Sequence, residues 1–444
     1  MMADLLALSS RLIDSGVLDE MPNRVTTELS EIADGLAVVE SFSHSVVLDS
    51  GDGLVAFDAS HSLTGGPVVE AIQGWRSDPV RRLVYTHGHA DHVGGSVNFA
   101  AAYDEMSVVG HRNVKRRFDR YRYTNGWNVA INARQFGGVR GEFGMGGQSD
   151  FIPADTREPD LVVDDAETLS IGDLSIELHH ARGETDDHLW GWVPDRRWLF
   201  VGDFVIWMFP NAGNPQKVQR WPIEWARALR TMASLGADLM MPAHGLPVEG
   251  AGRVRTVLTD IADALDLIVD QTIEMMNEGA VLDEVVHTVK VPDELLGKPY
   301  LMPFYDEPEF VIRNVWRQFG GWWDGAPSRL KPSPDAELGM AVAEMVGGAG
   351  VLADRAAEAS AAGDHRLASH LADLAGWAAP GDRAVHRVRA DVYWARRQAE
   401  SSLMAKGIFS GAARESEVIA DPDNAPSGAA RSPEAPGSSA SSRA

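Results

Sequence analysis

Three histidines and an aspartate fall within six residues of this sequence, in a stretch that reads Thr-His-Gly-His-Ala-Asp-His-Val-Gly-Gly over residues 86–95. Imidazole nitrogens and carboxylate oxygens are the ligands that Zn²⁺ takes at about 2 Å. His87 and His89 can serve one cation while Asp91 and His92 serve a second, since a strand-to-loop corner lets alternate side chains point inward together. Chance clustering in a surface loop is the weaker interpretation, because the whole chain of 444 residues has only 14 histidines. We therefore interpret this stretch as the core of a dinuclear metal site.

The His-x-His-x-Asp-His spacing resembles the signature of the metallo-β-lactamase superfamily. That resemblance implies an α/β fold, an αββα sandwich, in which the ends of later strands contribute the remaining ligands. Two cations held close together lower the pKa of a shared water and polarise the oxygens of a substrate. We expect a hydrolase that uses a metal-activated water and two divalent metal ions, for which we expect Zn²⁺.

Three later residues meet the requirement for further ligands at strand ends: Glu184, Asp203 and His244. A histidine is more usual in the superfamily at the position of Glu184, so His188 stays open as the competing ligand. Asp203 is expected to bridge the two cations, because each of its carboxylate oxygens can take one ion. The full assignment places His87, His89 and Glu184 on one metal, and Asp91, His92 and His244 on the other.

Composition narrows the classes of partner and substrate. The formal net charge of −24 repels phosphate backbones, so we expect no nucleic acid partner. The chain has no cysteine, which excludes disulfides and thiolate ligands. We find neither a signal peptide nor an apolar run near the roughly 18 residues of a membrane span. We therefore expect no membrane contact, a cytoplasmic location and a small-molecule substrate.

Hydrophobic patterning divides the chain into segments that must position these residues. Short strands alternate with helices over 20–255, which we interpret as the catalytic domain. Within it, Arg112 to Asp160 shows aromatics among many Gly and Arg with no sustained period, and we interpret it as an irregular lid or pocket wall. Helical patterns continue through a connecting segment, 256–330, and an all-α helical-hairpin domain, 331–414. The tail, 415–444, is rich in Pro, Ser, Ala and Gly and is expected to be disordered.

Landmarks beyond the metal stretch resemble those of the alkyl sulfatases. They are Gly-Gly-Trp-Trp-Asp-Gly-Ala-Pro at 320–327, Met-Val-Gly-Gly-Ala at 345–349, Ala-Ala-Gly-Asp-His-Arg at 361–366, Gly-Ile-Phe-Ser-Gly-Ala at 407–412 and, more faintly, Asn-Ala-Arg-Gln-Phe-Gly at 132–137. The resemblance implies that the helical domain is a dimerisation domain. It also implies an export leader and a third, lipid-transfer-like domain in family members, neither of which we find here.

The resemblance favours a sulfate ester, alkyl or aryl, as the substrate. The family's Arg-Gly-Ala sulfate-binding stretch is replaced here by residues 211–220. Within it Lys217 and Arg220 can grip an oxyanion, which makes them catalytic candidates together with Asp91; an equally good interpretation is that both are solvent-exposed charges at the start of a helix. The alternative substrates carry another activated C–O bond, in a nitroaryl or other aryl alkyl ether, a carboxylic ester or a lactone.

The helical domain also predicts the quaternary structure. Its apolar stripe, which includes Met340, Met345, Val346 and Leu352, either covers the sandwich or forms an interface with a partner, and we favour the interface. We expect a homodimer, or a hetero-oligomer with a paralogous subunit. A non-catalytic assembly subunit is the rival class, but such a chain would be free to lose metal ligands, and here a full set is present.

Overall fold

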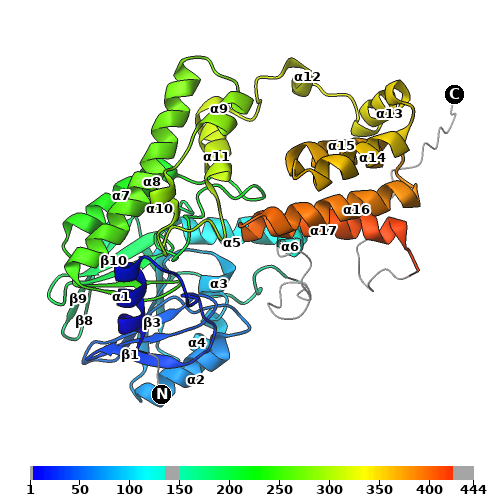
Figure 1. Ribbon diagram of the computed structural model, residues 1–444. Helices are drawn as coiled ribbons and strands as arrows, with labels where there is room; N and C mark the ends of the chain where they lie inside the picture. Colours follow the sequence, from blue (N-terminus) through cyan, green and yellow to red (C-terminus); the bar gives the residue numbers. More distant parts are fainter. Residues whose placement is uncertain (1–3, 136–149, 424–444) are drawn as a thin grey trace, which may run out of the picture. The chain divides into compact units, whose positions relative to one another are not determined.

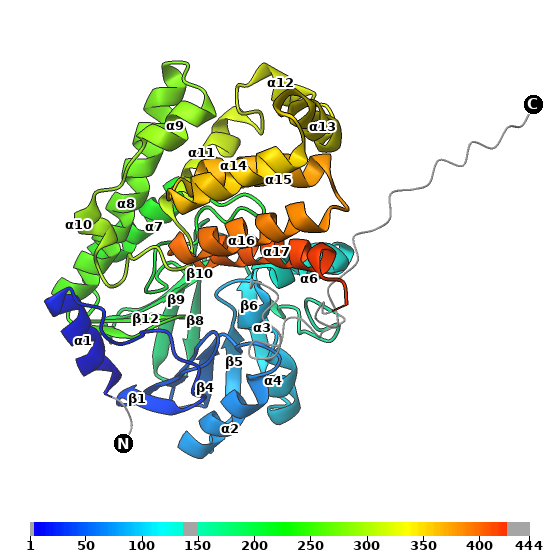
Figure 2. The ribbon, with the colours of Figure 1, turned by 45° about the vertical axis from the view of Figure 1, so that its right-hand side comes forward.

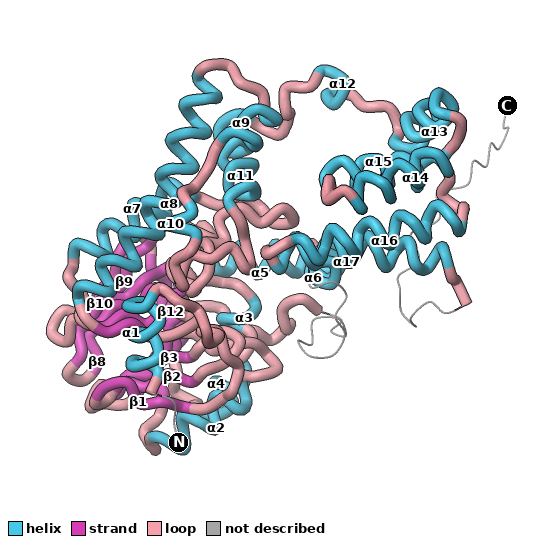
Figure 3. Tube along the Cα trace, viewed as in Figure 1, coloured by secondary structure: helices cyan, strands magenta, loops and turns pink. Residues whose placement is uncertain are grey.

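The computed structural model describes residues 4–135 and 150–423. Within these ranges the chain forms two compact units (Figure 1). The first contains the described residues of 1–133, 139–329 and 401–404, and the second those of 134–138, 330–400 and 405–444. All strands belong to the first unit, and the second is helical (Figure 3).

A seven-stranded sheet forms one layer of the first unit, with its strands in sequence order. The first four strands pair antiparallel, and β4 to β7 pair parallel. Parallel pairing needs crossover connections, which the helices between these strands supply. The strands are β1 (Leu29–Ala33), β2 (Leu36–Val39), β3 (Ser45–Asp49), β4 (Leu54–Phe57), β5 (Val80–Val84), β6 (Ser107–His111) and β7 (Leu161–Val163).

The second layer is a six-stranded sheet with the order β13-β12-β11-β10-β9-β8. Strands β8 to β11 pair antiparallel, while β11 and β12 run parallel. Strands β9, β11 and β12 therefore all point in the same direction and end at one edge. The strands are β8 (Ala166–Ile171), β9 (Leu174–His180), β10 (Leu189–Val193), β11 (Trp198–Gly202), β12 (Leu239–Pro242) and β13 (Val248–Glu249).

Alternating side chains along the strands bind the layers together. Val55 and Phe57 of β4 join the core between the two sheets, where Phe57 stacks on Phe200 of β11 with ring centroids 4.5 Å apart. Leu54 and Ala56 point the other way, into a second core under the outer helices. The strands read as continuous apolar runs because both faces are buried. The result is the predicted αββα sandwich.

Helices cover both outer faces of the first unit. Helices α2 and α4 lie on the seven-stranded sheet, while α7 and α8 pack together on the six-stranded one (Figure 2). The helices are α1 (Leu5–Ser15), α2 (Gly65–Trp75), α3 (Ala90–Val93), α4 (Ser96–Ala102), α5 (Asn113–Tyr123), α6 (Asn125–Gln135), α7 (Pro222–Ser234), α8 (Ala251–Asn277), α9 (Leu282–Thr288), α10 (Asp293–Leu296), α11 (Pro308–Gly320) and α12 (Pro327–Leu330).

The second unit consists of helical hairpins, with small cores that include Ala353, Ala372 and Val385. Helix α17 runs to Ala420, so its end lies within the stretch expected to be a tail; residues 424–444 lie outside the described part of the chain. No single helix within 4–135 and 150–423 is long and apolar enough to cross a membrane; only α13 and α14, bent by 88°, pass when joined. The helices are α13 (Asp335–Val346), α14 (Ala349–Ala361), α15 (His365–Ala378), α16 (Arg383–Ala399) and α17 (Leu403–Ala420).

The expectation of an irregular stretch from Arg112 to Asp160 is wrong over its first half, which forms α5 and α6. In α5 the buried side chains Val114, Phe118 and Tyr121 recur at helical spacing. The helical periodicity was difficult to recognise in the sequence, because only three apolar residues carry it and arginines lie between them. Residues 136–149 of the same stretch lie outside the described residues.

Candidate metal centre

The histidine-rich stretch lies directly after β5, at the edge where the parallel strands end. His87 is fully buried, and His89 is the N-cap residue of the short helix α3, which carries Asp91 and His92 on its first turn. Glycines let the backbone pass this close to its neighbours: a Cβ at Gly95 would lie 2.1 Å from the carbonyl oxygen of Ala59. Local turn geometry therefore brings four polar side chains to one point.

The other three predicted ligands come from the six-stranded sheet. Glu184 follows β9, Asp203 comes directly after β11, and His244 comes two residues after β12. Because these three strands run in the same direction, their ends meet the end of β5 across the sandwich. Backbone bonds tie the two sheets at this edge, since Leu189 donates to the carbonyl of Thr86 at 2.6 Å.

Four of the predicted ligands form a first group. Nε2 of His87 lies 2.8 Å from Nδ1 of His89, and the same Nδ1 lies 3.5 Å from Oε1 of Glu184. Oδ2 of Asp203 lies 3.9 Å from Nε2 of His87. Each of the four residues offers one ligand atom, and these atoms lie within 4.8 Å of one another.

Asp91, His92 and His244 form a second group with the same 4.8 Å limit between ligand atoms. Oδ2 of Asp91 lies 3.5 Å from Nε2 of His92 and 3.4 Å from Nε2 of His244. Asp203 reaches this group as well, with one oxygen 3.5 Å from Nε2 of His92 and the other 3.5 Å from Nε2 of His244. The structure thus brings all seven predicted residues together and places Asp203 between the two groups.

The donor atoms suit divalent cations. Among the residues that the structure describes, Nε2 of His92, Oε2 of Glu184 and Oδ1 of Asp203 are buried and have no hydrogen-bond partner. Leaving a buried polar atom unpaired costs about 1–3 kcal/mol. Burial also raises the pKa of Glu184, and a cation bound nearby would lower this pKa again. Imidazole and carboxylate donors without sulfur are the ligand set of hydrolytic zinc sites.

Asp58 orients the predicted ligand His92. Its Oδ2 accepts a hydrogen bond from Nδ1 of His92 at 2.7 Å, and its two oxygens accept bonds from the backbone and hydroxyl of Thr86, both at 2.7 Å. Asp58 adopts a left-handed backbone conformation with φ of 60°, which is strained for a residue with a Cβ. Although burial alone would lower the pKa of His92, the carboxylates of Asp203, Asp91 and Asp58 raise it well above its ordinary value. Because Nδ1 of His92 is bonded to the carboxylate of Asp58, Nε2 is the nitrogen that faces the cluster.

Glu184, and not His188, lies in the metal-ligand geometry. Nε2 of His188 accepts the backbone N–H of Asp203 at 3.1 Å, and its ring stacks on that of His87 with centroids 4.7 Å apart. His188 therefore contacts two of the predicted ligands, Asp203 and His87, without belonging to either group. The imidazole of His188 leaves no room for a side chain at Gly202, because a Cβ there would lie 2.6 Å from the ring.

Arg117 and Asp187 brace the metal stretch, and sequence reasoning missed both. Nε of Arg117 donates to Oδ2 of Asp187 at 2.8 Å, and that oxygen also accepts the backbone N–H of Gly88 at 3.1 Å. Arg117 also pairs with Asp186. Gly88 lies between the ligands His87 and His89, so this ion pair fixes the backbone that carries them. The adjacent acidic residues after Glu184 were the available signal, but nothing local pointed to Arg117.

Lys217 and Arg220 lie beside the cluster, and the interpretation as exposed charges at a helix start is wrong. Arg220 is 2% exposed, with Nη1 at 2.5 Å from Oε1 of Glu184. Lys217 is partly buried: its Nζ donates to Oδ1 of Asn132 on α6 at 3.0 Å and lies 5.6 Å from the ring centroid of Phe151. Burial, with the positive charge of Arg220, lowers the pKa of Lys217 to about 7.

Two further side chains of the site were not predicted as site residues: Asn211 lies in the segment 211–220 that replaces the family's sulfate-binding stretch, and Tyr305 lies in a part of the sequence that carried no signal. Nδ2 of Asn211 donates to Oε1 of Glu184 at 2.5 Å, on the side away from the unpaired Oε2. Burial, and then the negative charges of Glu184 and Asp91, raise the pKa of Tyr305. Its phenol therefore stays protonated at neutral pH.

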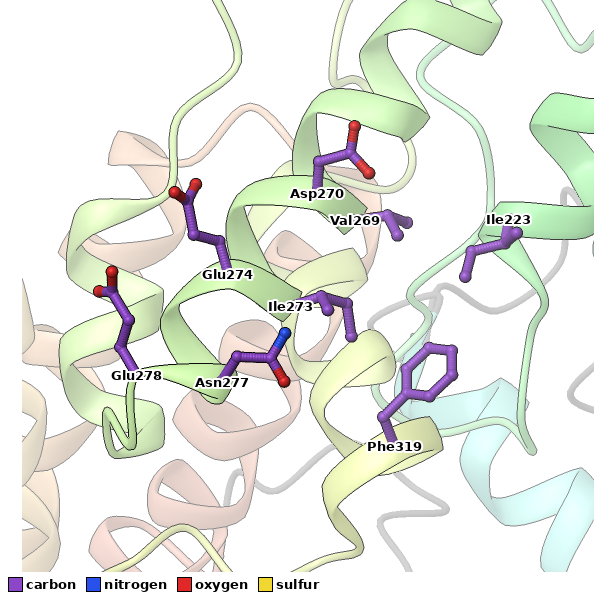
Figure 4. A pocket seen from close by; sticks show the side chains of 8 residues that line it. All are labelled: Ile223, Val269, Asp270, Ile273, Glu274, Asn277, Glu278 and Phe319. Carbon is purple, nitrogen blue, oxygen red and sulfur yellow. The ribbon is translucent and has the colours of Figure 1, made fainter.

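A separate groove of about 680 Å³ lies between α7, α8 and α11 (Figure 4). None of the predicted site residues lines it. Its walls combine apolar side chains with carboxylates of α8, and the lining residues are Ile223, Val269, Asp270, Ile273, Glu274, Asn277, Glu278 and Phe319. We assign no part of the metal chemistry to this groove.

Comparison with known families agrees with the fold. The model of the metallo-beta-lactamase superfamily matches residues 38–244, which contain all seven residues of the cluster. The alkyl sulfatase dimerisation model matches residues 281–418. The chain therefore carries a metallo-beta-lactamase superfamily domain followed by an alkyl sulfatase dimerisation domain.

Individual relatives are alkylsulfatases. A linear primary-alkylsulfatase of Pseudomonas sp. is 29% identical over 353 residues, which cover 74% of this chain and 65% of the relative. An (R)-specific secondary-alkylsulfatase of Pseudomonas sp. is 25% identical over 374 residues, covering 79% of this chain and 56% of the relative. The solved structure of an inverting sec-alkylsulfatase from Pseudomonas sp. superposes with a TM-score of 0.78 at 22% identity, over 88% of this chain and 66% of that one. The chain spans less than two thirds of the length of these relatives.

Proposed function

We propose that this protein is a dinuclear metal-dependent hydrolase of sulfate esters. The observation that carries the proposal is the cluster of seven imidazole and carboxylate side chains, beside which Lys217 and Arg220 place two cationic groups. The alkylsulfatase relatives support sulfate as the anion. The reaction converts a sulfate monoester and water into an alcohol and inorganic sulfate, with release of one proton.

His87, His89 and Glu184 would hold one cation, Asp91, His92 and His244 the other, and Asp203 would contact both. When bound, two divalent cations supply Lewis acidity and lower the pKa of water toward neutrality. Other side chains hold these residues in place: Asp58 orients His92, and Asn211 with Arg220 contacts Oε1 of Glu184, the oxygen that also lies 3.5 Å from Nδ1 of His89.

The anion would bind through the groups on the other side of Glu184. The ammonium of Lys217 and the guanidinium of Arg220 neutralise the sulfate, and a partly desolvated charge pair is stronger than one in water. Asn132 keeps the Lys217 side chain directed along α6.

The test is a hydrolysis screen with matched substrates on metal-loaded protein: an alkyl sulfate, an aryl sulfate, a carboxylic ester, a phosphate ester and a nitroaryl ether. We expect release of inorganic sulfate, and two metals per chain by elemental analysis. The variant His244→Ala serves as the control for contaminating esterases. Turnover of the carboxylic ester or the ether alone would replace sulfate by that substrate, and no turnover at all would favour a non-catalytic assembly subunit.

We also propose that the second unit pairs with a second copy of this chain. Its helices leave large apolar side chains in solvent, with exposed fractions of 52% for Met340, 77% for Met345 and 44% for Val346. Leu352, which was expected in the same stripe, is instead 4% exposed and packs inside the unit. Apolar patches of this kind mark protein interfaces, and the match to the dimerisation model supports the same partner.

A further inference from the structure

The segment 211–220, which carries Asn211, Lys217 and Arg220, forms no regular secondary structure. An irregular segment can place two cationic side chains only if other parts of the chain hold its backbone. Those parts are the turn before α11 and the buried face of that helix. Both lie within 281–418, outside the range that matches the metallo-beta-lactamase model.

Asp306 holds the first half of the segment. Its carboxylate is fully buried, and Oδ2 accepts the backbone N–H groups of Gly213 at 2.6 Å and Asn214 at 3.0 Å. Oδ1 accepts the N–H of Glu307 at 2.8 Å, so both oxygens are used. Gly213 packs directly on α11, because a Cβ at this residue would lie 2.4 Å from the backbone of Phe310. The segment therefore has no freedom to move toward the helix.

Asn314 holds the second half. Its side chain is 2% exposed, and Nδ2 donates to the carbonyl oxygen of Arg220 at 2.9 Å while Oδ1 faces the N–H of the same residue at 3.4 Å. One amide thus pairs with both backbone groups of Arg220, as a neighbouring strand would. Oδ1 also accepts bonds from Gln219 at 3.1 Å and from Arg317 at 2.9 Å.

The two attachments fix the backbone on either side of Lys217, and the Arg220 side chain is fixed at its far end by Glu184. Nε of Arg220 is buried and has no hydrogen-bond partner among the described residues. We propose that Asp306 and Asn314 are positioning residues that hold segment 211–220 so that Lys217 and Arg220 present their charges to the substrate anion. This inference rests on the proposed function.

The test uses the full chain with Asn314→Ala and Asn314→Asp. The second variant keeps the shape and the acceptor but cannot donate to Arg220, so it covers the case in which the alanine variant fails to fold. Asn277→Ala, at an exposed position of α8, is the matched control. Three quantities are measured: kcat and KM for an alkyl sulfate, the inhibition constant of inorganic sulfate, and hydrogen exchange of the peptide that spans 211–221.

We expect both Asn314 variants to raise KM and the inhibition constant of sulfate by about tenfold, because one buried hydrogen-bonding group loses its partner. Exchange in 211–221 should become faster, metal content should equal that of the wild type, and Asn277→Ala should change none of these quantities. Faster exchange with unchanged KM and inhibition constant, or unchanged exchange, would overturn the inference. A wild type that neither hydrolyses sulfate esters nor binds sulfate would instead overturn the proposed function, and the exchange measurement would still decide whether Asn314 holds the segment.

Discussion

Asp203 is the side chain on which the proposed centre depends most, because its two oxygens face ligands from both groups. When no cations are bound, burying the charged carboxylate of Asp203 has an electrostatic cost. Burial would raise the pKa of Asp203, but the neighbouring charges of His92 and His244 lower it below its ordinary value, so the side chain stays ionised. An ionised carboxylate between two sets of imidazoles is the arrangement that a pair of cations requires.

We predict that Asp203→Asn reduces metal content below two per chain and lowers kcat by about 100-fold or more, since a bound cation contributes several kcal/mol to the transition state. Elemental analysis and steady-state kinetics on the same sample give both values. Asp263→Asn, an exposed carboxylate of α8, provides the control. A variant that keeps two metals and full activity would show that Asp203 is not a shared ligand.

We predict a pH dependence that belongs to Lys217. Its pKa of about 7 means that the ammonium loses its proton as the pH rises through neutrality, and with it the charge that holds an anion. kcat/KM for a sulfate ester should therefore fall on the alkaline side. In Lys217→Arg, which keeps its charge, this fall should disappear; an identical alkaline limb in both proteins would exclude Lys217 as its source.

Local spacing made it predictable from sequence that the seven candidate ligands lie together, while the residues that support them were not predictable. His87 to His92 lie within one turn and a short helix, and the later ligands each follow a strand. Arg117 and Asn314 instead meet partners far along the chain, and their residue types are usually found in solvent. Only the packing of the folded chain shows that these two side chains are buried, because no periodicity or motif in the sequence indicates their burial.

At the level of elements, strand direction assembles the candidate centre, and a helix supports it. The three strands of the six-stranded sheet that carry ligands point the same way, and α5 reaches the metal stretch through Arg117. The apolar runs of the central strands were readable because both faces are buried. Helix α5 was not, because its polar positions outnumber the three buried apolar ones.

We predict that Arg117→Leu lowers the free energy of unfolding by about 3–5 kcal/mol, because it leaves the carboxylate of Asp187 buried without a cation. Arg230→Leu removes an arginine that pairs with Asp263 and Asp266 at the surface, and it should cost only about 0–1 kcal/mol. Urea unfolding of the three metal-free proteins measures the difference. Equal losses in both variants would mean that the buried pair adds no more stability than an exposed one.

At the level of the whole molecule, the proposed chemistry and the proposed association fall to different units. The candidate centre lies entirely in the first unit, and the exposed methionines Met340 and Met345 lie in the second. Disrupting one function should therefore leave the other intact. The likeness to alkylsulfatases spans both units, since the two family models match residues on either side of the division.

We predict that the double variant Met340→Glu with Met345→Glu raises the dimer dissociation constant by roughly 100-fold or more, since each methionine contributes about 1.5–3 kcal/mol when buried. Sedimentation velocity over a concentration series measures it, and metal content should not change. Met21→Glu, at a position 60% exposed in the first unit, is the control. A double variant that remains dimeric at every concentration would place the interface elsewhere.

The order of the supporting residues along the chain has a consequence for biosynthesis. A polypeptide leaves the ribosome from its amino terminus, and its domains fold as they emerge. The last metal ligand, His244, emerges before Asp306 and Asn314, which hold the anion-binding segment. If the proposed centre binds cations, a nascent chain can gather them while segment 211–220 still lacks its supports. Under the same proposal, retention of a substrate begins only after α11 has been synthesised and has docked.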